Sequence, residues 1–212
     1  MLNKLLPTAN SHMLLTEDEK QQVIEDGAAA YAKYLDALRI DWRNDPHSAD
    51  TPRRVAKAFV NDFGRGCYEE GPSVTAFDNN EKYAGMVFQG NIHVRSMCSH
   101  HHAPFMGVAH VAYIPKKNGK VIGLSKLNRI VDWFARRPQV QESLTKQIHT
   151  HIDEVCENSH GVAVMVSAQH TCCSNRGIKQ DSTMKTALMS GDFLEDTSLA
   201  RPEFYDFVRD LV

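Results

Sequence analysis

The sequence lacks both a long apolar run and a marked excess of charge of one sign. No stretch of about 18 apolar residues occurs, so no segment is expected to span a membrane. The N-terminal segment is apolar only briefly before Pro7 and Asn10 interrupt it, and it lacks the cleavage site of a secretory signal. The 24 basic residues nearly balance the 26 acidic ones, unlike the positive field typical of proteins that bind nucleic acids or membrane surfaces. We therefore expect a cytoplasmic protein with neither nucleic acid nor membrane as a partner.

Cysteine is also scarce. The 212 residues include five cysteines, an odd number in a chain that is long enough to fold without disulfides. Metal binding or catalysis is therefore the better expectation for them. A hydrophobic content of 42% can supply one good core and a smaller appendage. We expect four regions: a flexible arm at 1–15, a helical region at 16–66, a catalytic domain at 67–193, and a tail with a helix at 194–212.

The spacing of apolar residues predicts two helices, two strands, two helices and two strands, in that order. Thr16 and Glu19 form a capping box at the start of the first helix. Thr51 is a candidate cap for the second helix, whose first turn accommodates Pro52. Alternation over 105–113 predicts a long strand with one face fully buried. The remaining elements are expected to be helices at 125–136 and 138–157, strands at 161–167 and 183–193, and a last helix at 202–212. This order argues for an α+β fold with one antiparallel sheet.

Two short segments contain the residue types that bind zinc. Cys98 and His101 are three residues apart and can turn onto one ion, and Cys172 is the natural third ligand from far along the chain. Zinc prefers thiolate and imidazole groups, and three protein ligands leave a fourth position open for catalysis. If the last strand segment stays extended, His170 and Cys172 face the same side, while Cys173 faces away as a small buried hydrophobe. The alternative is that the histidine run is a solvated turn that binds metals adventitiously.

Six short segments follow one another along the chain. They are TPRRVAK at 51–57, SMCSHH at 96–101, AYIP at 112–115, IGLSKLNR at 122–129, RPQVQE at 137–142 and HTCCSNRG at 170–177. Their order resembles the signature of the GTP cyclohydrolase I family over roughly residues 16–193. The resemblance implies the tunnelling fold, with a four-stranded antiparallel sheet, two helices packed on it and an N-terminal helical extension. It also implies a homo-oligomer, a decamer in the family, in which sheets close into a barrel and active sites lie at subunit interfaces.

The reaction that the resemblance implies is hydrolysis of GTP to 7,8-dihydroneopterin triphosphate and formate. The implied cofactor is Zn²⁺, held by Cys98, His101 and Cys172. Zinc lowers the pKa of bound water, which gives a hydroxide that can attack C8 of the purine. This attack requires N7 to be protonated or hydrogen-bonded, a role for His100, while His170 would move protons during ring opening and sugar rearrangement. The alternative for either histidine is that it only orients a metal ligand.

The resemblance also implies how GTP is held. Glu142 would accept the N1–H and 2-amino groups of guanine, with Gln141 as a second contact. An ordinary first-turn residue favoured by the helix dipole is the alternative for Glu142. Ser125, which opens a helix whose N–H groups can bind anions, is grouped with the catalytic residues. The residues expected to bind the triphosphate are Lys126, Arg129 and Arg176, together with Arg54 and Lys57 from a neighbouring subunit. Solvation at the surface is the alternative for each of these cations.

The sequence departs from the family pattern at a few positions. Ser99 stands where the family usually has Glu, and Val108 stands where it usually has Lys. These departures affect the rate and the substrate details more than the class of reaction. Two alternatives are a different tunnelling-fold enzyme that acts on another purine or pterin, and a non-catalytic protein stabilised by zinc. The choice among zinc, manganese and iron is open, as is the pathway that uses the product, which could be folate, tetrahydrobiopterin or deazapurine synthesis.

Overall fold

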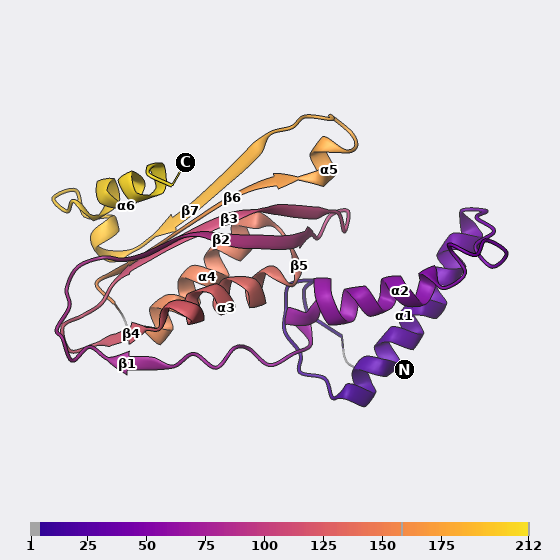
Figure 1. Ribbon diagram of the computed structural model, residues 1–212, viewed down its shortest axis with the longest axis horizontal. Helices are drawn as coiled ribbons and strands as arrows, with labels where there is room; N and C mark the ends of the chain where they lie inside the picture. The colour runs from indigo at the N-terminus through magenta and orange to yellow at the C-terminus, as the bar shows by residue number, and fades with distance from the viewer. Residues whose placement is uncertain (1–4, 158, 212) are drawn as a thin grey trace. The chain divides into compact units, whose positions relative to one another are not determined.

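The computed structural model describes residues 5–157 and 159–211 (Figure 1). Residues 1–4 of the expected arm and residue 212 of the expected last helix lie outside this part. The chain forms two compact units, one comprising Met1–Glu70 and Arg136–Pro138, the other Gly71–Ala135 and Gln139–Val212. No helix in the described part is both long and apolar enough to cross a membrane.

The first unit contains a pair of helices. The expected capping box begins α1 (Glu17–Ala37). In α2 (Thr51–Ala58), Asp50 occupies the cap position and Thr51 is already helical, so the expectation that Thr51 caps this helix was wrong. A π-helical turn at Phe59–Phe63 and a 3-10 turn at Arg65–Cys67 follow. Residues 5–15 form no helix or strand, but the Leu15 side chain is buried in the core of this unit.

The second unit is built around a sheet with the strand order β5-β2-β3-β6-β7. Its strands are β2 (Val87–Cys98), β3 (Pro104–Ile114), β5 (Pro138–Gln139), β6 (Gly161–His170) and β7 (Thr183–Met189). The four long strands pair antiparallel, as expected. The short β5 adds a fifth strand in the described part, where the sequence predicted four. A separate two-stranded sheet of β1 (Ala76–Asp78) and β4 (Lys120–Ile122) was not predicted.

The start of the second long helix also differs from the prediction. Pro138 was expected to begin it, but α4 begins later and spans Gln141–Val155. The intervening Gln139 is buried, and its side-chain amide donates to the Phe134 carbonyl. The backbone carbonyl of Gln139 accepts a hydrogen bond from the Ser99 N–H at 3.2 Å. These bonds hold the segment extended at the sheet edge, beside the end of β2.

Helices cover both faces of the sheet. On one face lie α3 (Leu124–Ala135) and α4, and on the other lies α6 (Ala200–Arg209) (Figure 1). Because strand side chains alternate between faces, β3 contributes to two cores. It sends Ala109, Val111 and Tyr113 to the core under α3 and α4, and Ala112 and Ile114 to the core under α6. The strand was expected to be fully buried on one face, but its second half is buried on both.

Candidate metal centre and active site

The turn between β2 and β3 carries the first two candidate ligands. Cys98 is the last residue of β2, and its N–H donates to the Ala103 carbonyl at 2.8 Å. The His102 N–H donates back to the Cys98 carbonyl at 2.8 Å. His102 has a φ of 50°, a left-handed conformation that tightens the turn. This local geometry brings the side chain of His101 back toward the thiol of Cys98.

The third candidate ligand comes from a short helical turn, α5 (Thr171–Ser174). The strand β6 ends at His170, so the expected strand alternation does not extend to Cys172. The Thr171 hydroxyl donates to the Pro104 carbonyl at 2.6 Å, which fastens this turn to the start of β3. Cys173 was expected to be buried, but the helical turn leaves it exposed.

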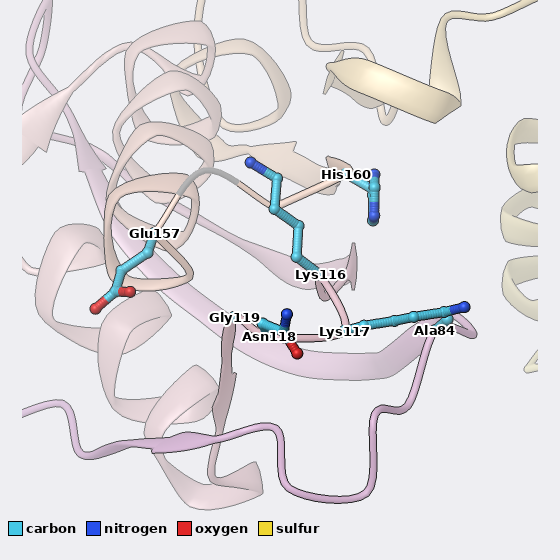
Figure 2. Close-up of a pocket in the computed structure, with 7 residues that line it drawn as sticks. All are labelled: Ala84, Lys116, Lys117, Asn118, Gly119, Glu157 and His160. Carbon is cyan, nitrogen blue, oxygen red and sulfur yellow. The ribbon is translucent and has the colours of Figure 1, made fainter.

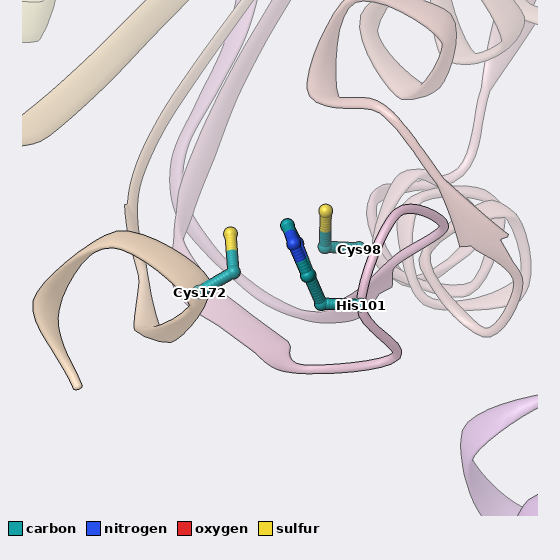
Figure 3. A group of neighbouring side chains, drawn as sticks. All are labelled: Cys98, His101 and Cys172. Carbon is teal, nitrogen blue, oxygen red and sulfur yellow. The ribbon is translucent and has the colours of Figure 1, made fainter. Parts of the chain in front are cut away.

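The three candidate ligands converge in the structure. Each of Cys98, His101 and Cys172 offers one ligand atom, and these three atoms lie within 4.8 Å of one another (Figure 3). Bond lengths of about 2.0–2.3 Å put the ligand atoms of a tetrahedral zinc site about 3.5–3.8 Å apart. The side chains therefore need only small shifts to close on one ion. Two sulfurs and an imidazole form a donor set that can hold a metal.

The environment of Cys172 is consistent with a site for a cation. Burial and the neighbouring Cys98 thiol together raise the pKa of Cys172 to about 11. Two adjacent sulfurs disfavour each other's negative charge, and a bound cation reverses this effect, because coordination deprotonates a thiol. The residues present therefore fit a thiophilic divalent ion.

Two histidines lie beside the candidate ligands. The Nδ1 atom of His100 is 3.7 Å from the Cys98 sulfur, and the His100 side chain is exposed. The ring of His170 stacks on Phe105, with ring centroids 4.5 Å apart and planes 9° apart. Burial lowers the pKa of His170, while the Glu142 carboxylate acts to raise it. The sequence did not single out Phe105, and its place under His170 follows from pairing of β3 with β6.

The two residues that open α4 differ in exposure. Glu142 is exposed in the first turn, where its charge reaches His170. Gln141 is only 1% exposed. Its Oε1 lies 2.9 Å from Nε2 of His170, and its amide nitrogen bonds to β6 and β7. Gln141 would have to break one of these bonds to contact a substrate with its side chain.

The expected triphosphate residues divide between two ends of the sheet. Ser125 and Lys126 open α3 just after Ile122, whose N–H donates to the Tyr113 hydroxyl at 2.8 Å. Tyr113 is nine residues along β3 from Pro104, which lies at the metal end. At about 3.4 Å per residue this is about 30 Å. Within one chain, therefore, the start of α3 and the candidate metal centre lie at opposite ends of β3.

The other expected cations lie in different places. The Arg176 guanidinium is at the metal centre, 2.9 Å from Nε2 of His101. Arg129 is exposed on α3. Arg54 and Lys57 are exposed on α2 in the first unit, where Arg54 forms an ion pair with Asp50 at 3.2 Å.

An α+β fold with a Cys-His-Cys group that could hold a metal ion, beside two histidines, is an arrangement suited to a metal-dependent enzyme. The family model described as GTP cyclohydrolase I matches residues 28–209, and the chain belongs to this family. "GTP cyclohydrolase 1" of Flavobacterium johnsoniae is 40% identical over 197 residues, covering 92% of this chain and 84% of that protein. The protein of the same name from Alkalilimnicola ehrlichii is 44% identical over 187 residues, with coverages of 85% and 96%. "GTP cyclohydrolase 1 1" of Pseudomonas syringae pv. tomato is 46% identical over 170 residues, with coverages of 75% and 83%.

Proposed function

We propose that this chain hydrolyses GTP to 7,8-dihydroneopterin triphosphate and formate at a zinc centre formed by Cys98, His101 and Cys172. The observation that carries the proposal is the convergence of these three ligands beside His100 and His170, in a chain that belongs to the GTP cyclohydrolase I family. One water enters for each GTP, and C8 of the purine leaves as the carbon of formate.

Zinc is the metal that the donor set favours. Two thiolates and one imidazole suit zinc better than magnesium or calcium, which prefer oxygen ligands. A site with three protein ligands keeps one coordination position open, and bound zinc there would supply a Lewis acid that activates water for attack on C8.

The two histidines would manage the protons of the reaction. His100 is exposed next to Cys98, so it can reach a bound purine and donate a hydrogen bond or a proton to N7. This contact makes C8 more electrophilic. His170 is held against Phe105, where a fixed imidazole can carry protons during ring opening and sugar rearrangement.

The guanine base would be bound by Glu142. Its carboxylate is exposed and close enough to His170 to influence that ring electrostatically. A carboxylate accepts two neighbouring N–H groups at once, as N1–H and the 2-amino group of guanine present them. Charge-assisted bonds of this kind are stronger than neutral ones.

The triphosphate would be bound by a site assembled from several copies of the chain. Arg176 lies at the candidate metal centre, whereas Ser125 and Lys126 lie near the other end of β3, a strand about 30 Å long from Pro104 to Tyr113. If all of them serve one GTP, the start of α3 must come from a second copy. Arg129, Arg54 and Lys57 would complete the positive site. A homo-oligomer in which sheets join edge to edge in a tunnelling barrel, as in the decamer of the family, meets this requirement.

The test is turnover by purified protein loaded fully with zinc. Incubation with GTP should release formate and yield a pterin that fluoresces after oxidation. Cys172→Ala should lose both zinc and turnover, whereas the matched variant Cys173→Ala should keep both, because Cys173 is exposed and is not one of the three residues whose ligand atoms converge. A zinc-loaded protein that does not convert GTP would refute the proposal and favour a non-catalytic role. Conversion of another purine nucleotide in place of GTP would favour a different tunnelling-fold activity.

A further inference from the structure

The amide group of Gln141 has only one orientation that satisfies its surroundings. Its nitrogen lies 3.0 Å from the Val166 carbonyl and 3.1 Å from the Met184 carbonyl. Carbonyl oxygens only accept hydrogen bonds, so the atom facing them must be the NH₂ group. A flipped amide would place Oε1 against two other oxygens in a buried site. Oε1 must therefore face His170.

A pair of threonines fixes the same orientation independently. The Thr145 hydroxyl donates its hydrogen to the backbone carbonyl of Gln141 at 3.0 Å. In the 2.6 Å contact between the Thr145 and Thr186 hydroxyls, Thr186 must then be the donor. The Thr186 oxygen is thereby left to accept from the Gln141 amide nitrogen, 3.1 Å away. The NH₂ group shares its two hydrogens among three acceptors, and in each arrangement this nitrogen is the donor.

This orientation determines which nitrogen of His170 carries a hydrogen. Nε2 of His170 lies 2.9 Å from Oε1 of Gln141, and an amide oxygen can only accept. Nε2 must therefore be the donor, which leaves Nδ1 of the neutral ring with its lone pair. Stacking on Phe105 holds the plane of the ring while Gln141 holds its edge.

We propose that Gln141 is a positioning residue that holds His170 as the Nε2–H tautomer and so presents Nδ1 as the acceptor for substrate protons. The inference depends on the proposed function only for the role of His170 in proton transfer. In this inference the Gln141 side chain binds His170, whereas the family resemblance suggested that it binds the guanine base. The side chain is 1% exposed and fully engaged by protein groups, which supports this assignment.

The experiment compares two substitutions in the same network. Gln141→Met keeps the length of the side chain but removes its hydrogen bonds to His170. Thr186→Val removes one partner of the amide nitrogen, yet the Val166 and Met184 carbonyls still orient Gln141. The zinc-loaded proteins are labelled with ¹⁵N in histidine, and solid-state NMR reports the tautomer of His170. The His170 signal is identified by its loss in His170→Asn.

We expect the Nε2–H form in the wild type and in Thr186→Val, and a mixture of tautomers in Gln141→Met. We also expect Gln141→Met to lower kcat about 10- to 100-fold, as is typical of residues that orient an active-site histidine. KM for GTP and the zinc content should change little. An Nδ1–H tautomer in the wild type would overturn the inference, and this measurement does not depend on turnover. An unchanged tautomer in Gln141→Met with a raised KM would also overturn it, and would assign Gln141 to the base. Failure of GTP turnover in the wild type would instead contradict the proposed function.

Discussion

The five cysteines of the chain differ in their surroundings. Cys67 and Cys156 are fully buried, and burial raises the pKa of Cys67 to about 11 and that of Cys156 to about 12. Cys98 and Cys172 belong to the candidate metal centre. Cys173, directly next in sequence to a ligand, is exposed. Because the thiolate is the reactive form, these differences determine which thiols react with a reagent.

We expect one thiol of the zinc-loaded protein, that of Cys173, to react rapidly with iodoacetamide at pH 8. Cys67 and Cys156 should react only after unfolding, since each is both inaccessible and protonated. Peptide mass spectrometry of the labelled protein identifies the modified residue. Cys173→Ser should abolish the fast label without loss of zinc. Rapid labelling of Cys67 or Cys156 in the native protein would contradict the packing described here.

At the candidate site, the sequence was informative about residue types and less so about orientation. The three-residue spacing of Cys98 and His101 correctly predicted that they converge. Cys172 lies near both of them, as the prediction requires, although the strand alternation used to choose it ends at His170 with β6. The engagement of Gln141 with β6 and β7 could not be predicted, since it depends on contacts between residues more than 20 positions apart.

At the scale of helices and strands, the sequence predicted the start of an element correctly where neighbouring residues alone determine that start. The capping box at the start of α1 is present as expected. Pro138 was expected to begin the second long helix, but the structure places it in the short strand β5. A hydrogen bond from the Ser99 N–H, 40 positions earlier in the sequence, holds the adjacent Gln139 extended at the sheet edge. The short strands β1 and β4 were missed for the same reason: their pairing with each other defines them, and neither is long enough to show a periodic pattern.

The join between β3 and β4 depends on one buried phenol. The Tyr113 hydroxyl accepts from the Ile122 N–H at 2.8 Å and lies 3.4 Å from the Ile122 carbonyl, and the side chain is 1% exposed. We expect Tyr113→Phe to lower the free energy of unfolding by about 1–3 kcal/mol, because a buried N–H loses its partner. Urea unfolding at pH 7 measures the difference. Tyr205→Phe, on the exposed part of α6, is the matched control and should unfold like the wild type.

The same residue gives an expected pH dependence. Burial raises the pKa of Tyr113 to about 12 from its ordinary value of 10.0. The folded state therefore holds this proton more tightly than the unfolded state does. The resulting stability is fully present below pH 10 and is lost as the pH rises toward 12. The stability difference between wild type and Tyr113→Phe should therefore shrink between pH 9 and pH 12. A difference that stays constant over this range would show that the phenol is not buried as described.

At the scale of the whole molecule, two groups of residues that a single GTP would need lie far apart within one chain. The candidate metal centre and Arg176 lie at one end of β3, and Lys126 lies near the other end, with about 30 Å of strand between the two ends. A nucleoside triphosphate is too short to bridge this distance. A catalytic site of the proposed kind must therefore combine the metal end of one copy with the α3 start of another.

This requirement predicts that two inactive variants can restore each other. Lys126→Glu should repel the triphosphate, and Cys172→Ala should remove the metal, so each homo-oligomer should be nearly inactive. Co-expressed with different tags and purified through both, random mixed oligomers should recover about a quarter of wild-type turnover, since about one site in four combines two intact halves. Cys98→Ala with Cys172→Ala is the matched control and should stay inactive, because neither chain supplies a complete metal centre. No turnover in the Lys126 mixture would mean that one chain supplies both parts of its own site. Turnover in the control would instead mean that the metal ligands themselves come from two chains.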